Sequence, residues 1–151
     1  MKIERSLNPI LFFSKEEKKD VVEAIQVAEK KTSGEIRVHL ERKLKDDHLK
    51  HAESLFEKLG MTQTEKRNSV LIVLGVKSKR FAVLADQGIH EKVGQDFWEE
   101  LVGRMQAKFR EDRFAEGLTE AIASIGKKLS QYFPYERDDV NELPDEISYS
   151  L

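Results

Sequence analysis

Apolar residues recur at helical spacing in four parts of this chain. In residues 15–31 they follow Ser14 and Glu17, which have the Ser-x-x-Glu spacing of a capping box. A second helix is expected to begin at Asp46 or Asp47 and to end at Gly60. Two more are predicted near the C-terminus: one capped by Asp96 and carrying Phe97 to Phe109, and one over residues 114–133 that ends at Pro134.

Three further segments have the pattern of strands. Residues 35–42 alternate between apolar and polar side chains, which is typical of a strand with one covered face. Residues 69–76 are almost continuously apolar, so we expect that strand to be covered on both faces. Residues 80–86 follow after a short turn and form a hairpin with it.

The predicted order is therefore α-β-α-β-β-α-α. A helix joins the first two strands, so they should be parallel, and the hairpin adds an antiparallel strand. The expected fold class is α/β, a small mixed β-sheet sandwiched between helices. We expect one domain over residues 1–134, followed by an acidic, irregular tail over residues 135–151, with Leu143, Ile147 and Tyr149 as candidate anchors.

The amino-acid composition excludes several classes of function. The formal net charge of -2 argues against a dedicated nucleic-acid binder, whose surface is usually strongly basic. The absence of cysteine excludes disulfides, thiol nucleophiles and iron–sulfur clusters. The apolar run of residues 9–13 is too short for a signal peptide or a membrane span, and no later run is long enough. We therefore expect a cytoplasmic protein without membrane insertion.

Common catalytic signatures, including the P-loop, His-Glu-x-x-His and Gly-x-Ser-x-Gly, are absent. His48 and His51, with Asp47 before them, have a spacing that places metal ligands on one helix face. A solvated face of a charged helix is the favoured interpretation, because a tight transition-metal site needs further ligands.

Acidic residues in two loops form a stronger candidate. Asp86 ends the third predicted strand, and His90 and Glu91 follow it closely. Asp96 is near in sequence, and Glu111 and Asp112 precede the last helix. If Asp86 and Asp112 meet at one end of the sheet, these oxygens suit calcium or magnesium better than zinc. The alternative, left open, is that the acids are helix caps and turn formers.

Four segments in order resemble the TPM domain, also called the TPM phosphatase domain. They are Thr32–Val38, Arg67–Leu74, Asp86–Ile89 and Phe109–Leu118. The resemblance covers about residues 15 to 133. The segment Asn141–Ile147 also resembles the ending of a cytoplasmic, single-domain bacterial subgroup.

This resemblance implies an α/β sandwich, and the family includes a thylakoid-lumen acid phosphatase and members that bind divalent cations, chiefly calcium. Asp86 and Gln87 depart from the family's Gly-Tyr-Gly turn, and Glu111 stands where the family has glycine. Added carboxylates favour a cation and repel a phosphate ester unless a metal bridges it.

We therefore expect a domain that binds Ca²⁺ or Mg²⁺ and acts as an accessory or interaction protein with an unidentified protein partner. The expected cation ligands are Asp86, Glu91, Asp96, Glu111 and Asp112. The alternative is a metal-assisted acid phosphatase, with His90 as the candidate proton donor.

Overall fold

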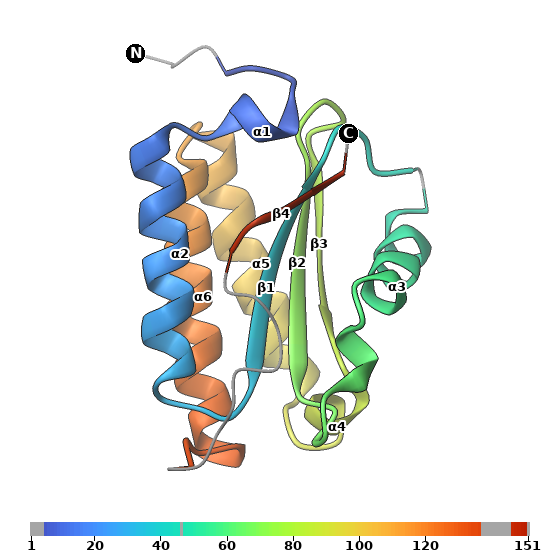
Figure 1. Cartoon of the computed structure of the whole chain (residues 1–151), viewed down its shortest axis with the longest axis vertical. Coiled ribbons are helices and arrows are strands. Elements are labelled where there is room, and N and C mark those ends of the chain that lie inside the picture. Colours follow the sequence, from blue (N-terminus) through green and yellow to red (C-terminus); the bar gives the residue numbers. More distant parts are fainter. Residues whose placement is uncertain (1–4, 46, 137–145, 151) are drawn as a thin grey trace.

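The structure of the chain, a computed structural model, describes residues 5–45, 47–136 and 146–150. Its helices and strands appear in Figure 1. In chain order they are α1 (Pro9–Phe12), α2 (Lys15–Glu29), β1 (Glu35–Glu41), α3 (His48–Lys58), the 3-10 helix η1 (Met61–Gln63), β2 (Ser69–Gly75), β3 (Arg80–Ala85), α4 (Gln87–His90), α5 (Gln95–Arg110), α6 (Phe114–Tyr132) and β4 (Ser148–Ser150).

The strands form one mixed sheet in the order β3-β2-β1-β4. β1 and β2 are parallel, with Glu35 opposite Ser69, and β3 returns antiparallel to β2, with Ala85 opposite Val70. Both pairings agree with the sequence prediction. The α/β fold class is confirmed.

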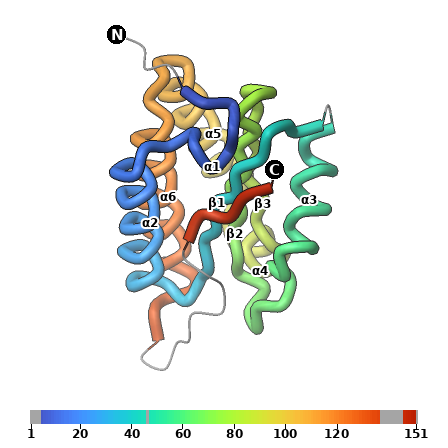
Figure 2. The backbone as a smooth tube through the Cα atoms, turned by 45° about the horizontal axis from the view of Figure 1, so that its top comes forward, coloured from blue at the N-terminus to red at the C-terminus, as the bar shows by residue number. Residues whose placement is uncertain are grey.

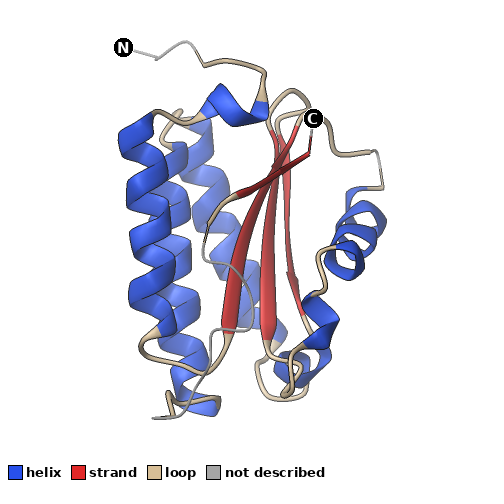
Figure 3. Ribbon diagram, in the orientation of Figure 1, coloured by secondary structure: helices blue, strands red, loops and turns tan. Residues whose placement is uncertain are grey.

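Helices cover both faces of the sheet. Figures 1 and 3 show α2, α5 and α6 on one side and α3 on the other. The apolar residues of β1 (Ile36, Val38, Leu40) join the larger core with the three helices. β2 contributes to both sides, because Leu71 and Val73 pack in a smaller core with α3. Its continuous apolar run is thus explained by burial on both faces.

Local capping accounts for several helix starts. Ser14 Oγ accepts a hydrogen bond from Glu17 N at 3.1 Å, and Ser14 N donates to Glu17 Oε1 at 3.0 Å, which confirms the capping box. Asp47 caps α3 by accepting from Lys50 N at 3.2 Å. The predicted cap of α5 is wrong by two residues: Gly94 is the N-cap, and Asp96 lies in the first helical turn.

Four short elements were not predicted, one of them the 3-10 helix η1 in the loop before β2. Asn8 and Pro9 begin α1, which contacts β1 and β4 across the end of the sheet where β1 finishes (Figure 2). α4 lies in the segment predicted to be a loop. Residues 148–150 add β4, parallel to β1, so the expectation of an irregular tail is wrong there. Ile147 is buried in the larger core, and Leu143 lies outside the described residues.

Candidate functional site

Buried polar side chains gather where β1 and β2 begin and β3 ends. This end of the sheet is called the polar end below. Since β3 is antiparallel to its neighbours, its last residues lie beside the first residues of β1 and β2. The buried polar residues there are Thr32, Glu35, Thr64, Asn68, Ser69 and Asp86.

Glu35, Ser69 and Asp86 lie in one row across three strands. Glu35 is paired with Ser69, and Asp86 N donates to Ser69 O at 2.9 Å. Residues in one row point to the same face of a sheet. That face is the one covered by α3 and η1, since Ser69 Oγ donates to the carbonyl of Met61 in η1 at 2.7 Å, and Met61 packs in the smaller core with α3. Two buried carboxylates therefore share a face with one serine between them.

Arg67 holds the carboxylate of Asp86 with two hydrogen bonds. Arg67 Nε donates to Oδ2 at 2.6 Å, and its NH2 group donates to Oδ1 at 2.7 Å. Oδ1 also accepts from Gln87 N at 2.8 Å, which caps α4. The hydrogen bond to Asp86 raises the pKa of the Arg67 guanidinium above its ordinary value. Asp86 is 5% exposed, whereas the side chain of Arg67 is 36% exposed, so the pair opens to solvent on the arginine side.

The loop before β2 packs closely against α4 and the start of β1. Arg67 has a positive φ of 51°, and its carbonyl accepts from Gly88 N at 2.9 Å. A Cβ on Gly88 would lie 2.4 Å from the carbonyl oxygen of Lys66, so only glycine fits there. Asn68 O accepts from Glu35 N at 3.2 Å. Three of the four TPM-like segments thus meet at the polar end.

The acids of the predicted cation site do not all meet there. α5 starts near α4 and extends roughly 24 Å at 1.5 Å per residue, so the turn after it lies at the opposite end of the sheet (Figure 1). Asp112 Oδ1 is there 3.7 Å from Arg5 Nε. Glu111 Oε2 is 3.1 Å from Arg113 NH1. The expectation that Asp86 and Asp112 share one end of the sheet is wrong.

The other predicted residues stay near the polar end but are exposed. Glu91 follows α4 directly, and Asp96 lies in the first turn of α5. His90 is the last residue of α4, and its backbone N donates to Asp86 O at 3.2 Å. Within residues 5–45, 47–136 and 146–150, no group of three or more histidines and acids is arranged to hold a metal ion.

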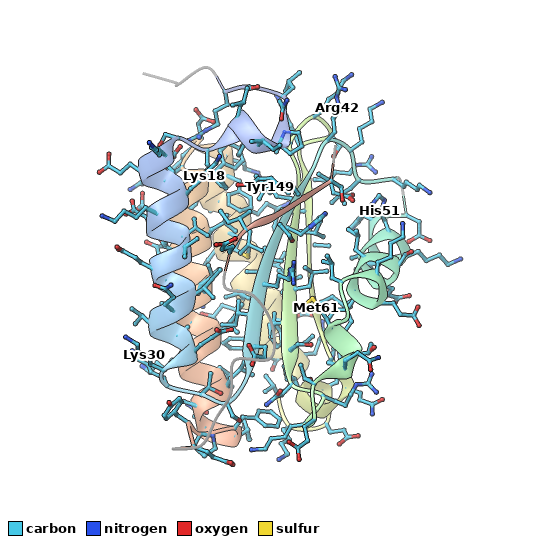
Figure 4. The ribbon with its side chains drawn as sticks, viewed as in Figure 1. Lys18, Lys30, Arg42, His51, Met61 and Tyr149 are labelled. Atoms are coloured by element: carbon cyan, nitrogen blue, oxygen red, sulfur yellow. The ribbon has the colours of Figure 1, made fainter. Side chains whose placement is uncertain are left out.

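The two histidines of α3 do not act as a pair. His51 Nε2 contacts Glu41 Oε2 of β1, while His48 begins the helix and is half-exposed. Figure 4 shows His51 on α3. The exposed helix face was therefore the better interpretation for His48 but not for His51.

Glu35, Arg67, Asn68 and Ser69 lie at the polar end but are not among the predicted site residues. All four stand in segments that carry the family resemblance, where the sequence pattern indicates only the start of a strand. Their position relative to the predicted strands is the signal that could have identified them. Each opens a predicted strand or lies one or two residues before it, and parallel strands begin at the same end of a sheet.

Comparisons with known proteins agree with the fold. The TPM domain matches residues 10–128. The NMR structure of the BA42 protein from the psychrophilic bacterium Bizionia argentinensis is 42% identical, with a TM-score of 0.86, over 92% of this chain and 96% of that chain. The search of curated proteins finds no match. No helix in the described part of the chain has the length and apolarity needed to cross a membrane. On the matched segments and the shared fold, the chain belongs to the TPM domain family.

Proposed function

We propose that this protein binds a divalent cation, calcium or magnesium, at the polar end and acts as an accessory or interaction protein. The observation that supports it is the row of Glu35, Ser69 and Asp86, which places two buried carboxylates on one face of the sheet. Calcium and magnesium prefer such oxygen ligands, with backbone carbonyls and water completing the shell. Glu111 and Asp112 take no part in this site.

Arg67 is central to the proposal because its guanidinium already neutralises Asp86. A cation that binds both oxygens of Asp86 has to replace the two hydrogen bonds from Arg67. The side chain of Arg67 is exposed enough for its guanidinium to move into solvent. The bound cation would then neutralise the buried carboxylate of Asp86 in its place. Cation binding and the Asp86–Arg67 ion pair are therefore competing states of one carboxylate.

The second candidate function is a metal-assisted phosphatase, which the position of Arg67 favours. An arginine next to a cation binds phosphate oxygens with two parallel hydrogen bonds. A bound cation supplies polarisation of the phosphoryl oxygen and activation of water. His90 lies on the short helix that Asp86 caps and is exposed, so it is the candidate to protonate the leaving group.

Thermal melting with and without calcium or magnesium tests the cation site. A cation at a hundredfold excess over its dissociation constant stabilises the folded state by about 2.7 kcal/mol. We expect this gain in the wild type and in Asp112→Asn, but not in Asp86→Asn. The Asp112 variant is the matched control, since it removes an acid at the other end of the sheet. A wild type that does not respond to either metal contradicts the proposal.

The Arg67→Met variant gives a second test, in which the affinity for the cation is expected to increase. Removing the competing guanidinium should tighten cation binding by about tenfold, equivalent to about 1.4 kcal/mol. Arg104→Met, on the exposed surface of α5, should leave the affinity unchanged. Weaker binding by Arg67→Met would show that Arg67 does not compete with the cation. Hydrolysis of an aryl phosphate that requires the cation and is lost in Asp86→Asn would favour the phosphatase over the accessory function.

A further inference from the structure

A second polar cluster lies along β1, on the face opposite the larger core. Arg37, His39 and Glu41 alternate with the apolar residues of the strand, so all three point to the side of α3. His39 is 2% exposed and Glu41 is 7% exposed. This cluster lies where the C-terminal strand β4 pairs with β1, with His39 opposite Ser148.

Both ring nitrogens of His39 contact hydroxyl groups of β4. Nδ1 is 2.7 Å from Ser148 Oγ, and Nε2 is 2.9 Å from Ser150 Oγ. The two serines lie two residues apart, so they point to the same face and can hold one ring between them. Arg37 Nε also donates to Ser148 Oγ, at 3.2 Å. A neutral imidazole donates from one nitrogen and accepts at the other, and a hydroxyl can take either role.

The charged groups around His39 come from β1 and α3. Glu41 Oε1 is 3.5 Å from His39 Nε2, and the other oxygen of Glu41 contacts His51 Nε2. Burial lowers the pKa of His39 below its ordinary value, and the neighbouring Arg37 and His51 act in the same direction. Glu41 acts against them but is shared with His51, so burial prevails. The serines on β4 carry no charge to offset a proton on the ring.

Besides this cluster, β4 is held by its pairing with β1 and by a small contact with α1. The strand has three residues and forms three pairs with β1. Ile147 is buried ahead of it, and Lys18 Nζ lies 5.6 Å from the ring centroid of Tyr149 on the opposite face (Figure 4). An edge strand with so few contacts can open locally without unfolding the rest of the domain.

We propose that β4 is a pH-sensitive latch, which is docked on β1 while His39 is neutral and is released when His39 gains a proton. Released, the imidazole is hydrated and titrates near its ordinary value of about 6.5. Docked, it resists protonation, so protons bind preferentially to the released state. Docking is therefore complete well above pH 6.5. It weakens by up to about tenfold per pH unit below that value, until the docked ring is itself protonated.

Amide NMR spectra of the full chain between pH 8 and pH 5 test the latch. In the wild type, the amide signals of residues 148–150 should move to unstructured positions below about pH 6.5, while those of β2 stay in place. The His39→Gln variant keeps hydrogen bonding at this position but does not titrate, so its β4 signals should not depend on pH. His48→Gln, which changes a half-exposed histidine at the start of α3, should behave as the wild type does.

Three results would overturn the proposal. The β4 signals of the wild type could stay unchanged down to pH 5. The transition could persist in His39→Gln, or be lost in His51→Gln while His39 is intact. If His39→Gln does not fold, the imidazole signals of His39 in the wild type are followed over the same pH range. If the midpoint of the His39 ring titration differs from the midpoint of the change in the β4 amide signals, the latch is contradicted.

Discussion

Replacement of Gly88 by alanine tests whether close packing at the polar end constrains the fold. Gly88 is the second residue of α4, and its N donates to Arg67 O at 2.9 Å. An added Cβ would lie 2.4 Å from Lys66 O and 2.6 Å from Arg67 O. Both neighbours are backbone atoms, which cannot rotate away as a side chain can. Either α4 or the loop before β2 has to shift.

The size of the effect follows from two opposing contributions. Overpacking of a tight contact usually costs about 1–3 kcal/mol. Alanine in a helix recovers up to about 1 kcal/mol relative to glycine. We therefore expect Gly88→Ala to lower the free energy of unfolding by about 1–2 kcal/mol, and each kcal/mol lowers Tm by about 2–4 °C in a chain of this size. The shift should also loosen the Asp86–Arg67 pair, since both residues belong to the same contact.

Gly103→Ala is the matched control, because a Cβ on Gly103 in α5 meets no atom within 4 Å. The same chemical change should there raise the free energy of unfolding by about 0.5–1 kcal/mol. Urea denaturation followed by circular dichroism measures both variants. If Gly88→Ala proves as stable as the wild type, or changes stability in the same direction as Gly103→Ala, the reasoning about close packing is refuted.

Two further predictions concern the C-terminal strand and the N-terminal segment. Ile147→Ala should lower the free energy of unfolding by about 2–4 kcal/mol in urea denaturation, because Ile147 is 8% exposed in the larger core; a loss below about 0.5 kcal/mol would show that the C-terminal strand is not part of the fold. Hydrogen bonds from Arg5 lower the pKa of Glu17, so the wild type should be more stable than Glu17→Gln above the ordinary carboxyl pKa. That difference should fade as the pH falls through the lowered pKa, and urea denaturation at pH 7 and pH 3 that gives equal differences would contradict it.

The location of the candidate site was only partly predictable. Asp86 was identified correctly as the residue that ends β3, and the structure places it in a buried, charged setting. Its partner Arg67 is 19 residues away, in a polar loop without any periodic pattern. Asp112 was assigned to the wrong end of the sheet, because the length and direction of α5 decide where the following turn lies.

Patterns that arise within a few neighbouring residues determined most of the architecture from sequence. The capping box of Ser14 and Glu17, the alternation in β1 and the apolar run of β2 each reflect local geometry or burial on a repeating face. Their order was enough to give a mixed sheet with parallel and antiparallel pairs. The TPM-like segments could also be recognised from sequence, since each is a short run of neighbouring residues around the start of a strand or helix.

Only the tertiary structure decided the features that depend on partners far apart in the chain. β4 consists of three residues without a pattern of their own, and it exists because His39 and the edge of β1 supply its hydrogen bonds from more than 100 residues away. α4 is one turn of helix, too short to form without Asp86 at its start and the carbonyl of Arg67 against Gly88. A short segment gains too little from its own residues to offset the entropy of ordering it, so its structure is set by the surface on which it packs.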